Sequence, residues 1–179
     1  MRKVSGEIGE SVFQDNGQDW IATWHLSPEP QAGTPHGSAG VCLPPSGEIV
    51  LVSQDGKRWE LPEGRPEGDG DWLATLEREV REEACATVID ASLLGFARGV
   101  CVKGPEEGLV LVRAVWRADI EILPWEPLHE TTSRMLIEPH EALAQMTIPD
   151  GLMPLFHRFI DDALLISRAS HEGGANALR

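Results

Sequence analysis

One stretch constrains this chain more than any other: residues 64–86, GRPEGDGDWLATLEREVREEACA, where charged side chains are densest. Apolar residues recur there at helical spacing, which predicts a helix beginning near Trp72 with Asp71 as its N-cap. At about 100° per residue, four apolar side chains fall on one stripe that would face a core. These four are Leu73, Leu76, Val80 and Ala84.

Three carboxylates, those of Glu79, Glu82 and Glu83, share the flank beside this stripe. Like charges repel, and a carboxylate near an apolar edge loses hydration, so the arrangement costs stability unless a cation lies between them. Hard oxygen ligands suit Mg2+, with Mn2+ as the alternative. Arg78, one turn before Glu82, could neutralise or orient that carboxylate. The alternative is a solvated helix face with exposed ion pairs that add little stability.

The segment before the helix extends this pattern. Residues 59–61 read as the end of a short strand, and a loop rich in Pro and Gly follows, up to residue 70. This sequence of strand, loop and acidic helix resembles the Nudix box of MutT-like pyrophosphohydrolases, whose pattern is G-x5-E-x7-R-E-U-x-E-E-x-G-U. The resemblance covers residues 64–86 of the chain.

In this register Gly64 matches the first glycine of the box. The remaining matches are Arg78 and Glu79 at the R-E pair, Val80 at the U position, Glu82 and Glu83 at the E-E pair, and Ala86 at the last apolar position. Two positions depart from the pattern. Gly70 stands where the pattern has Glu, and Asp69 or Asp71, which flank it, is the candidate to supply the lost carboxylate. Cys85 stands where the pattern has Gly, and a side chain there adds strain if the backbone needs positive φ.

The resemblance implies an α/β fold, a Nudix-like α/β/α sandwich with a mixed β-sheet. It also implies an enzyme, a Nudix hydrolase: an Mg2+-dependent pyrophosphohydrolase that cleaves a nucleoside diphosphate linked to another moiety. By the same resemblance Glu79, Glu82 and Glu83 bind the metal and one of them activates water. Arg78 orients a glutamate, and Gly64 lets the loop turn closely toward the metal, where Glu63 presents its carbonyl.

Catalytic bases of Nudix-like enzymes can come from a loop outside the box. The irregular segment 123–136 contains two candidates, Glu126 and Glu130. Each can equally be an exposed loop glutamate without a catalytic role. Contacts to base, sugar and leaving group are expected from variable loops, here residues 27–39 and 123–136.

Two other functions stay open. The departures at Gly70 and Cys85 are compatible with a catalytically degenerate Nudix-like module that binds a nucleotide or regulates a partner. A non-hydrolytic relative, such as a metal-dependent isomerase, is the third hypothesis, because the box alone does not define the reaction.

The net charge of the chain limits the classes of binding partner. A formal net charge of −14 disfavours a nucleic-acid polymer or an anionic membrane surface, since both would be repelled. A small phosphorylated nucleotide-type substrate remains, aided by metal and local cationic side chains. No apolar run approaches the length of a membrane span, and no secretory signal is visible. A homodimer is left open.

Cysteine usage indicates the compartment. Cys42, Cys85 and Cys101 are widely spaced, without a C-x-x-C pair. This set predicts free thiols in a reducing cytoplasm rather than a disulfide framework.

Hydrophobic patterning predicts one Nudix-like domain over residues 1–169 and a disordered tail over 170–179. Alternation or apolar runs predict strands, whereas residues 27–39 read as a loop interrupted by Pro and Gly. The predicted strands are 20–26, 40–43, 48–53, 58–61, 92–102, 109–116 and 120–123. A short helix is predicted from residue 139, and a longer amphipathic helix is expected to pack on the sheet. Its stripe consists of Leu152, Leu155, Phe156, Phe159, Ala163 and Ile166.

Overall fold

The computed structural model describes residues 9–67 and 71–166. The expectations for Asp69, Gly70 and the tail 170–179 therefore lie outside the described residues. Within these described ranges, eleven elements follow one another: β1 (Ser11–Asp15), β2 (Gln18–His25), β3 (Thr34–Leu43), β4 (Ile49–Ser53), β5 (Glu63–Gly64), α1 (Trp72–Ala84), β6 (Ala86–Lys103), β7 (Val110–Ile122), β8 (Ser133–Ile137), α2 (Pro139–Gln145) and α3 (Met153–Leu165).

The main sheet has six strands in the order β1-β2-β6-β7-β3-β5. β3 runs parallel to β7, and the other neighbours are antiparallel, so the sheet is mixed as predicted. β4 and β8 form a separate antiparallel pair. The two longest strands, β6 and β7, form a hairpin at the centre of the sheet.

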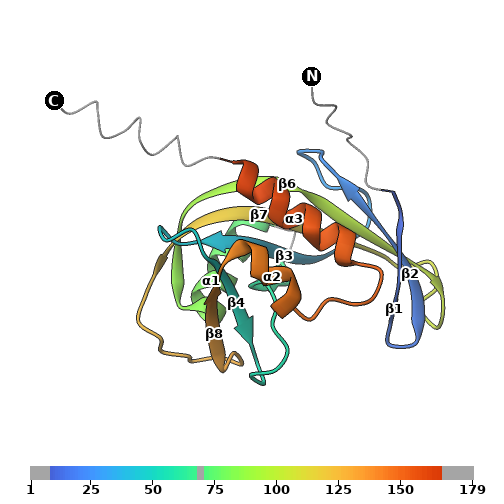
Figure 1. Ribbon diagram of the computed structural model, residues 1–179. Helices are drawn as coiled ribbons and strands as arrows, with labels where there is room; N and C mark the ends of the chain where they lie inside the picture. The colour runs from blue at the N-terminus through green and yellow to red at the C-terminus, as the bar shows by residue number, and fades with distance from the viewer. Residues whose placement is uncertain (1–8, 68–70, 167–179) are drawn as a thin grey trace.

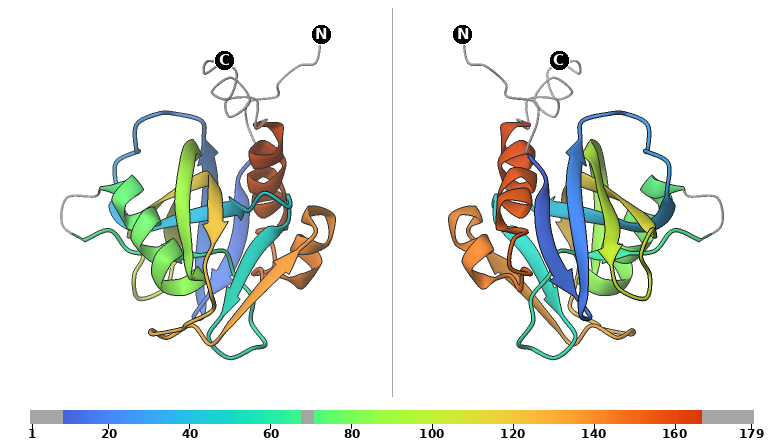
Figure 2. Two further views of the ribbon diagram at one scale, coloured as in Figure 1. Left: turned by 90° about the vertical axis from the view of Figure 1, so that its left-hand side faces the viewer. Right: turned by 90° about the vertical axis from the view of Figure 1, so that its right-hand side faces the viewer.

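Helices cover the two faces of this sheet, as the views in Figure 2 show: α1 lies on one side, and α3 lies on the other (Figure 1). Side-chain alternation along β3 explains both layers. Val41 and Leu43 join the apolar cluster that also contains the buried face of α3, whereas Cys42 joins the cluster that contains Leu76 and Val80 of α1. The predicted α/β/α sandwich is therefore confirmed.

Helix α1 begins where the sequence predicts. The side chain of Asp71 accepts a hydrogen bond from the backbone N of Ala74 at 2.9 Å, the geometry of an N-cap. One stripe position is wrong: Leu73 is 39% exposed. The partly buried Trp72 packs edge-on against Phe96 of β6 instead, with 5.5 Å between ring centroids, so the buried face is turned toward this ring.

Helices α2 and α3 also occur where they were predicted. Leu155, Phe159 and Ala163 of α3 are buried against the sheet, while the stripe residue Ile166 lies just past the helix as its C-cap. The expected packing of this helix on the sheet is confirmed.

Several strand boundaries differ from the prediction. Residues 27–39 are not all loop, because β3 begins at Thr34 and pairs with β7 in spite of Pro35 and Gly37. β6 starts at Ala86, directly after α1, and β7 continues to Ile122 without the predicted break. The predicted strand 58–61 is only one bridge, between Glu60 and Val52. β1 and β8 were not predicted at all.

All three cysteines are buried free thiols, as predicted. Burial raises the pKa of the Cys42 thiol to about 12, which keeps it protonated at neutral pH. Among residues 9–67 and 71–166, none of the helices has the length and apolar character needed to cross a membrane.

Candidate active site

Gly64 in the loop of the box lies close to Glu79 on its helix. Gly64 lies on β5, which packs against α1 and pairs with Ser38 of β3. A Cβ atom on Gly64 would overlap the carboxyl group of Glu79. Only glycine therefore allows the Glu79 carboxylate to lie against the backbone here.

Glu83 lies one turn further along α1, beside Glu79. It accepts a hydrogen bond from the backbone N of Glu63 at 3.1 Å. Burial, chiefly, and then the neighbouring carboxylates of Glu79 and Glu63 raise the pKa of Glu83 to about 8, although the Glu63 N–H acts in the opposite direction. A hydrogen bond between the Glu79 and Glu83 carboxyl groups contributes to the same shift. Two acidic side chains thus lie close together on this flank of α1.

Arg78 connects the helix to the loop of the box. Its Nη2 donates to Glu79 Oε1 and to the carbonyl of Arg65, both at 3.0 Å, and its Nη1 lies 3.3 Å from Glu67 Oε1. The hydrogen bond to Glu79 raises the pKa of Arg78, with a smaller contribution from the Glu82 charge. Arg78 therefore orients Glu79 directly, whereas Glu82 acts on it through charge alone.

These groups fit a hard divalent cation in their chemistry. Neighbouring carboxylates repel each other when both are ionised, and a divalent cation between them relieves that repulsion. Mg2+ prefers oxygen ligands such as carboxylates and carbonyls. Within the described part of the chain, no three His, Cys, Asp or Glu side chains converge on one point as they stand. Glu79 and Glu83, with Glu82 on the same helix, are the residues that would hold such a cation.

Cys85, which replaces the glycine of the box pattern, lies at the C-terminus of α1. Cys85 is the C-cap, with φ 49° and ψ 56°, so this position does require the left-handed conformation that favours glycine. The side chain of Cys85 is nonetheless buried. A non-glycine residue in this conformation stores strain on the order of 1 kcal/mol.

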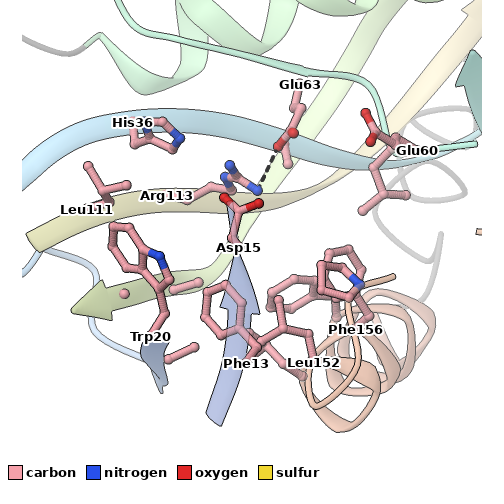
Figure 3. A pocket seen from close by; sticks show the side chains of 18 of the residues that line it. Phe13, Asp15, Trp20, His36, Glu60, Glu63, Leu111, Arg113, Leu152 and Phe156 are labelled. Carbon is pink, nitrogen blue, oxygen red and sulfur yellow. Dashed lines mark ion pairs between the residues drawn. The ribbon is translucent and has the colours of Figure 1, made fainter. Parts of the chain in front are cut away.

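A pocket of about 340 Å³ opens beside the box. Figure 3 shows its lining: Phe13 and Trp20 on one wall, Leu152 and Phe156 on another. Three cationic side chains also line it, those of Arg58, Arg98 and Arg113. Apolar and aromatic walls with a few charged groups are typical of sites for small organic ligands.

Glu63 links this pocket to the carboxylates of α1. Its side chain points into the pocket, where Oε2 lies 3.0 Å from Nη1 of Arg113 (Figure 3). Its backbone N holds Glu83, as described above. Burial and the charges of Arg113 and Arg65 lower the pKa of His36, another lining residue, which favours its neutral form at pH 7.

A smaller hollow, of about 180 Å³, includes Glu83 in its lining. Arg58 and Glu60 line both this hollow and the larger pocket, so they stand where the two meet. Burial, followed by the Glu63 charge, raises the pKa of Glu60. The sequence analysis did not single out Arg58 or Glu60. Their alternation with the buried Trp59 and Leu61 is the signal that could have placed both on one open face.

The two distal candidates for a base lie outside the helix that carries the carboxylate pair. Glu126 and Glu130 are both exposed, in the segment that joins β7 to β8. Glu130 accepts a hydrogen bond from Gln54 at 3.3 Å, and Gln54 lines the smaller hollow together with Glu83. Glu130 is therefore nearer to the site than its place in the sequence indicates.

The larger pocket is not built mainly from variable loops. Most of its walls come from strands β1, β2, β3, β6 and β7 and from α3. Within residues 27–39, His36 and Ala39 do line the pocket, but they belong to β3 and not to a loop. Arg113 was also missed. A charged residue within the apolar run VLVRAVW of β7 was the available signal.

Sequence comparisons found no matching family model and no matching curated protein. Solved structures do match. The Bacillus subtilis pyrophosphohydrolase BsRppH superposes with a TM-score of 0.66 at 22% identity, over 89% of this chain and 100% of that one. A Nudix hydrolase from Nitrosomonas europaea gives 0.56 at 18% identity, over 74% and 90% of the two chains. The Nudix domain of Shewanella oneidensis NrtR, solved with ADP-ribose, gives 0.52 at 14% identity, over 75% and 90%.

These likenesses show that the chain has the Nudix fold. At such identities they show the fold alone, and the reaction has to be argued from the site.

Proposed function

We propose that this chain is a Mg2+-dependent pyrophosphohydrolase, which cleaves the phosphoric anhydride of a nucleoside diphosphate linked to another moiety. One observation carries the proposal: Glu79 and Glu83 are brought together against Gly64 and the Glu63 backbone, in the register of the Nudix box. Structures named as a pyrophosphohydrolase and as Nudix hydrolases share the fold, which supports the same class of reaction.

A bound Mg2+ would neutralise phosphate oxygens and lower the pKa of an attacking water. Glu79, Glu82 and Glu83 are the residues that would hold it, with Mn2+ as the alternative ion. Arg78 keeps Glu79 in place through its 3.0 Å hydrogen bond. The backbone N–H of Glu63 keeps Glu83 in place. The backbone carbonyl of Glu63 is a further candidate ligand. Catalysis then depends on positioning, because in-line attack needs the water and the leaving oxygen opposed.

The pocket supports a nucleotide as the substrate. Its aromatic wall suits a base. Arg58, Arg98 and Arg113 supply cationic contacts for a polyphosphate, next to the carboxylates that line the same pocket, those of Asp15, Glu60 and Glu63. Arg58 and Glu60 line both the pocket and the hollow that contains Glu83. The pyrophosphate of a nucleotide that reaches from one to the other would therefore lie beside these two side chains. Buried free thiols agree with a reducing, cytoplasmic setting.

A substrate panel tests the proposal. Nucleoside triphosphates, dinucleoside polyphosphates, ADP-ribose, NADH and nucleotide sugars are incubated with Mg2+ or Mn2+, and the products are identified by chromatography. We expect release of phosphate or a mononucleotide from at least one compound. That release should disappear in both Glu82→Gln and Glu83→Gln, while Glu77→Gln, an exposed glutamate of the same helix, serves as the matched control.

A second function has its own support. Within the described residues no three candidate ligands converge, and Cys85 replaces the glycine of the box. Both facts favour a degenerate module that binds a nucleotide without turnover, and a Nudix domain has been solved with ADP-ribose bound. Tight nucleotide binding without any product across the panel would favour this module over the hydrolase. A rearranged product would instead indicate the isomerase.

A further inference from the structure

Arg134 of β8 makes an unusual set of contacts at the end of α1. A single atom, Nη1, donates to three backbone carbonyls: Ala84 at 2.8 Å, Cys85 at 3.1 Å and Leu123 at 3.1 Å. The first two close the C-terminus of α1, and the third belongs to the residue that follows β7. Arg134 thus joins the carboxylate helix to the end of a central strand.

The guanidinium is also held in place from another side. Its central carbon lies 5.0 Å from the centre of the Trp125 ring, a cation–π contact. Its backbone pairs with Val52 of β4, whose side chain is buried in the same apolar cluster as Val80 and Ala84. The arginine is therefore anchored by a strand, an aromatic ring and the helix core.

The contacts of Arg134 lie at the C-terminus of α1, where backbone carbonyls lack partners within the helix. The last carbonyls of a helix lack partners within the helix, and a cation there is favourable for the helix dipole. Cys85 adds strain, because it adopts φ 49° without being glycine. Charge-assisted hydrogen bonds to Ala84 and Cys85 offset that strain and fix the turn that carries Glu82 and Glu83.

We propose that Arg134 is a positioning residue, which fixes the last turn of α1 and thereby sets the affinity of Glu82 and Glu83 for a divalent cation. This proposal rests on the proposed function. It concerns a side chain that contacts backbone carbonyls and Trp125 rather than the proposed ligands, and it assigns to β8 a role that the box does not contain. Partners that orient metal ligands typically change metal affinity by about 10- to 100-fold when they are removed.

The chain offers a matched control for this arginine. Arg117 of β7 donates in the same way to backbone carbonyls at the end of α3, Ala163 at 2.7 Å and Ile166. Arg117 is buried, whereas Arg134 is only partly buried, and α3 has none of the proposed ligands. Loss of Arg117 should destabilise the fold without changing metal binding, so it separates a general cost of losing a helix cap from an effect on the site.

The experiment titrates Mn2+ into the full chain, with affinity measured by calorimetry and hydrogen exchange measured on the backbone amides of α1. We expect about tenfold weaker Mn2+ binding in Arg134→Met, faster exchange in the last turn of α1, and near wild-type affinity in Arg117→Met. Arg134→Lys keeps the charge and three donors, so it should recover most of the affinity. If Arg134→Met does not fold, Arg134→Lys tests the proposal alone, and we expect its Mn2+ affinity to be about threefold weaker than that of the wild type.

Unchanged Mn2+ affinity in both Arg134 variants would overturn the proposal and leave Arg134 a structural cap. An equal loss of affinity in Arg117→Met would overturn it as well. If the wild-type chain binds no Mn2+, the proposed function fails instead. Hydrogen exchange then still decides whether Arg134 fixes the turn that carries Glu82 and Glu83.

Discussion

At the scale of single residues, Gly64 is the glycine that the carboxylate helix depends on. A methyl group at this position would occupy the space of the Glu79 carboxyl group. In Gly64→Ala we therefore expect Glu79 to be displaced, Mn2+ affinity to fall by about 10- to 100-fold and turnover to fall with it. Calorimetry of Mn2+ binding and the rate of product release measure both effects.

Gly9 provides the control for this substitution, because a Cβ atom there meets nothing within 4 Å. Gly9→Ala should leave affinity and rate within about twofold of wild type. A Gly64→Ala variant with full metal affinity would show that Glu79 does not need its place against β5.

Glu83 should make the stability of the metal-free protein depend on pH. Its pKa is raised from 4.5 to about 8, chiefly by burial, so the folded state binds the proton more tightly than the unfolded state does. The stabilisation from protonated Glu83 is complete below about pH 4.5 and is lost as pH rises toward 8. We expect thermal melts without metal to show wild type losing stability over this range relative to Glu83→Gln.

Mg2+ should reverse this trend, because it binds the ionised carboxylate and stabilises the folded state at high pH. The expected result is a larger rise in melting temperature with Mg2+ at pH 8.5 than at pH 6. An equal rise at both values, or a rise that persists in Glu83→Gln, would contradict a role for Glu83 as a ligand.

The sequence alone could predict the residues of the box but not their partners. Fixed spacing on one helix was enough to place Glu79 and Glu83 on the same flank. Spacing gives no information on contacts between distant segments, so the Arg113 pair with Glu63 and the shared position of Arg58 and Glu60 were missed. Those contacts depend on how β5 and β7 are placed by the sheet.

At the scale of elements, the N-terminus of α1 separates folding from metal binding. Asp71 bonds the backbone N of Ala74 at 2.9 Å, so its carboxylate is used as a helix cap. We expect Asp71→Ala to lower the free energy of unfolding by about 1 kcal/mol and to leave Mn2+ affinity unchanged. Urea unfolding and Mn2+ titration give the two values, and Asp71→Ser should keep most of the stability. A loss of Mn2+ affinity would instead support Asp71 as the substitute for the carboxylate missing at Gly70.

Element boundaries show where local patterns stop being informative. Helix α1 could be predicted because its cap and its apolar spacing are local signals. The start of β3 at Thr34 could not, since its pairing with Leu111 of β7 lies far along the chain and overrides the local effect of Pro35. β8 was missed for the same reason. Its residues are only partly buried, and its partner β4 comes about 80 residues earlier.

At the scale of the whole molecule, the sheet separates two kinds of site. Helix α1, which carries the box glutamates, lies on one side of the sheet, and α3, which contributes to the aromatic wall of the pocket, lies on the other (Figures 1 and 2). Glu63 belongs to both, through its backbone N and through its side chain. The pocket of this acidic chain contains charges of both signs, because three arginines and three carboxylates line it: Arg58, Arg98, Arg113, Asp15, Glu60 and Glu63.

Arg113 allows these two halves to be tested apart. In Arg113→Leu the Glu63 carboxylate loses its partner at 3.0 Å and adds an unpaired negative charge to the pocket. We expect the KM for a nucleotide substrate to rise about tenfold, equivalent to about 1.4 kcal/mol, with kcat changed less than about twofold. Mn2+ affinity should stay at the wild-type value, because Glu83 is held by the backbone of Glu63 and not by its side chain.

Arg98 also lines the pocket, and Arg98→Leu removes a positive charge without affecting Glu63. The KM of that variant should rise less than that of Arg113→Leu, and this difference measures the cost of the exposed Glu63 carboxylate. A fall in kcat or in Mn2+ affinity in Arg113→Leu would show instead that the pocket and the carboxylate helix are coupled through the side chain of Glu63. The substrate pocket and the metal site would then have to be treated as one unit.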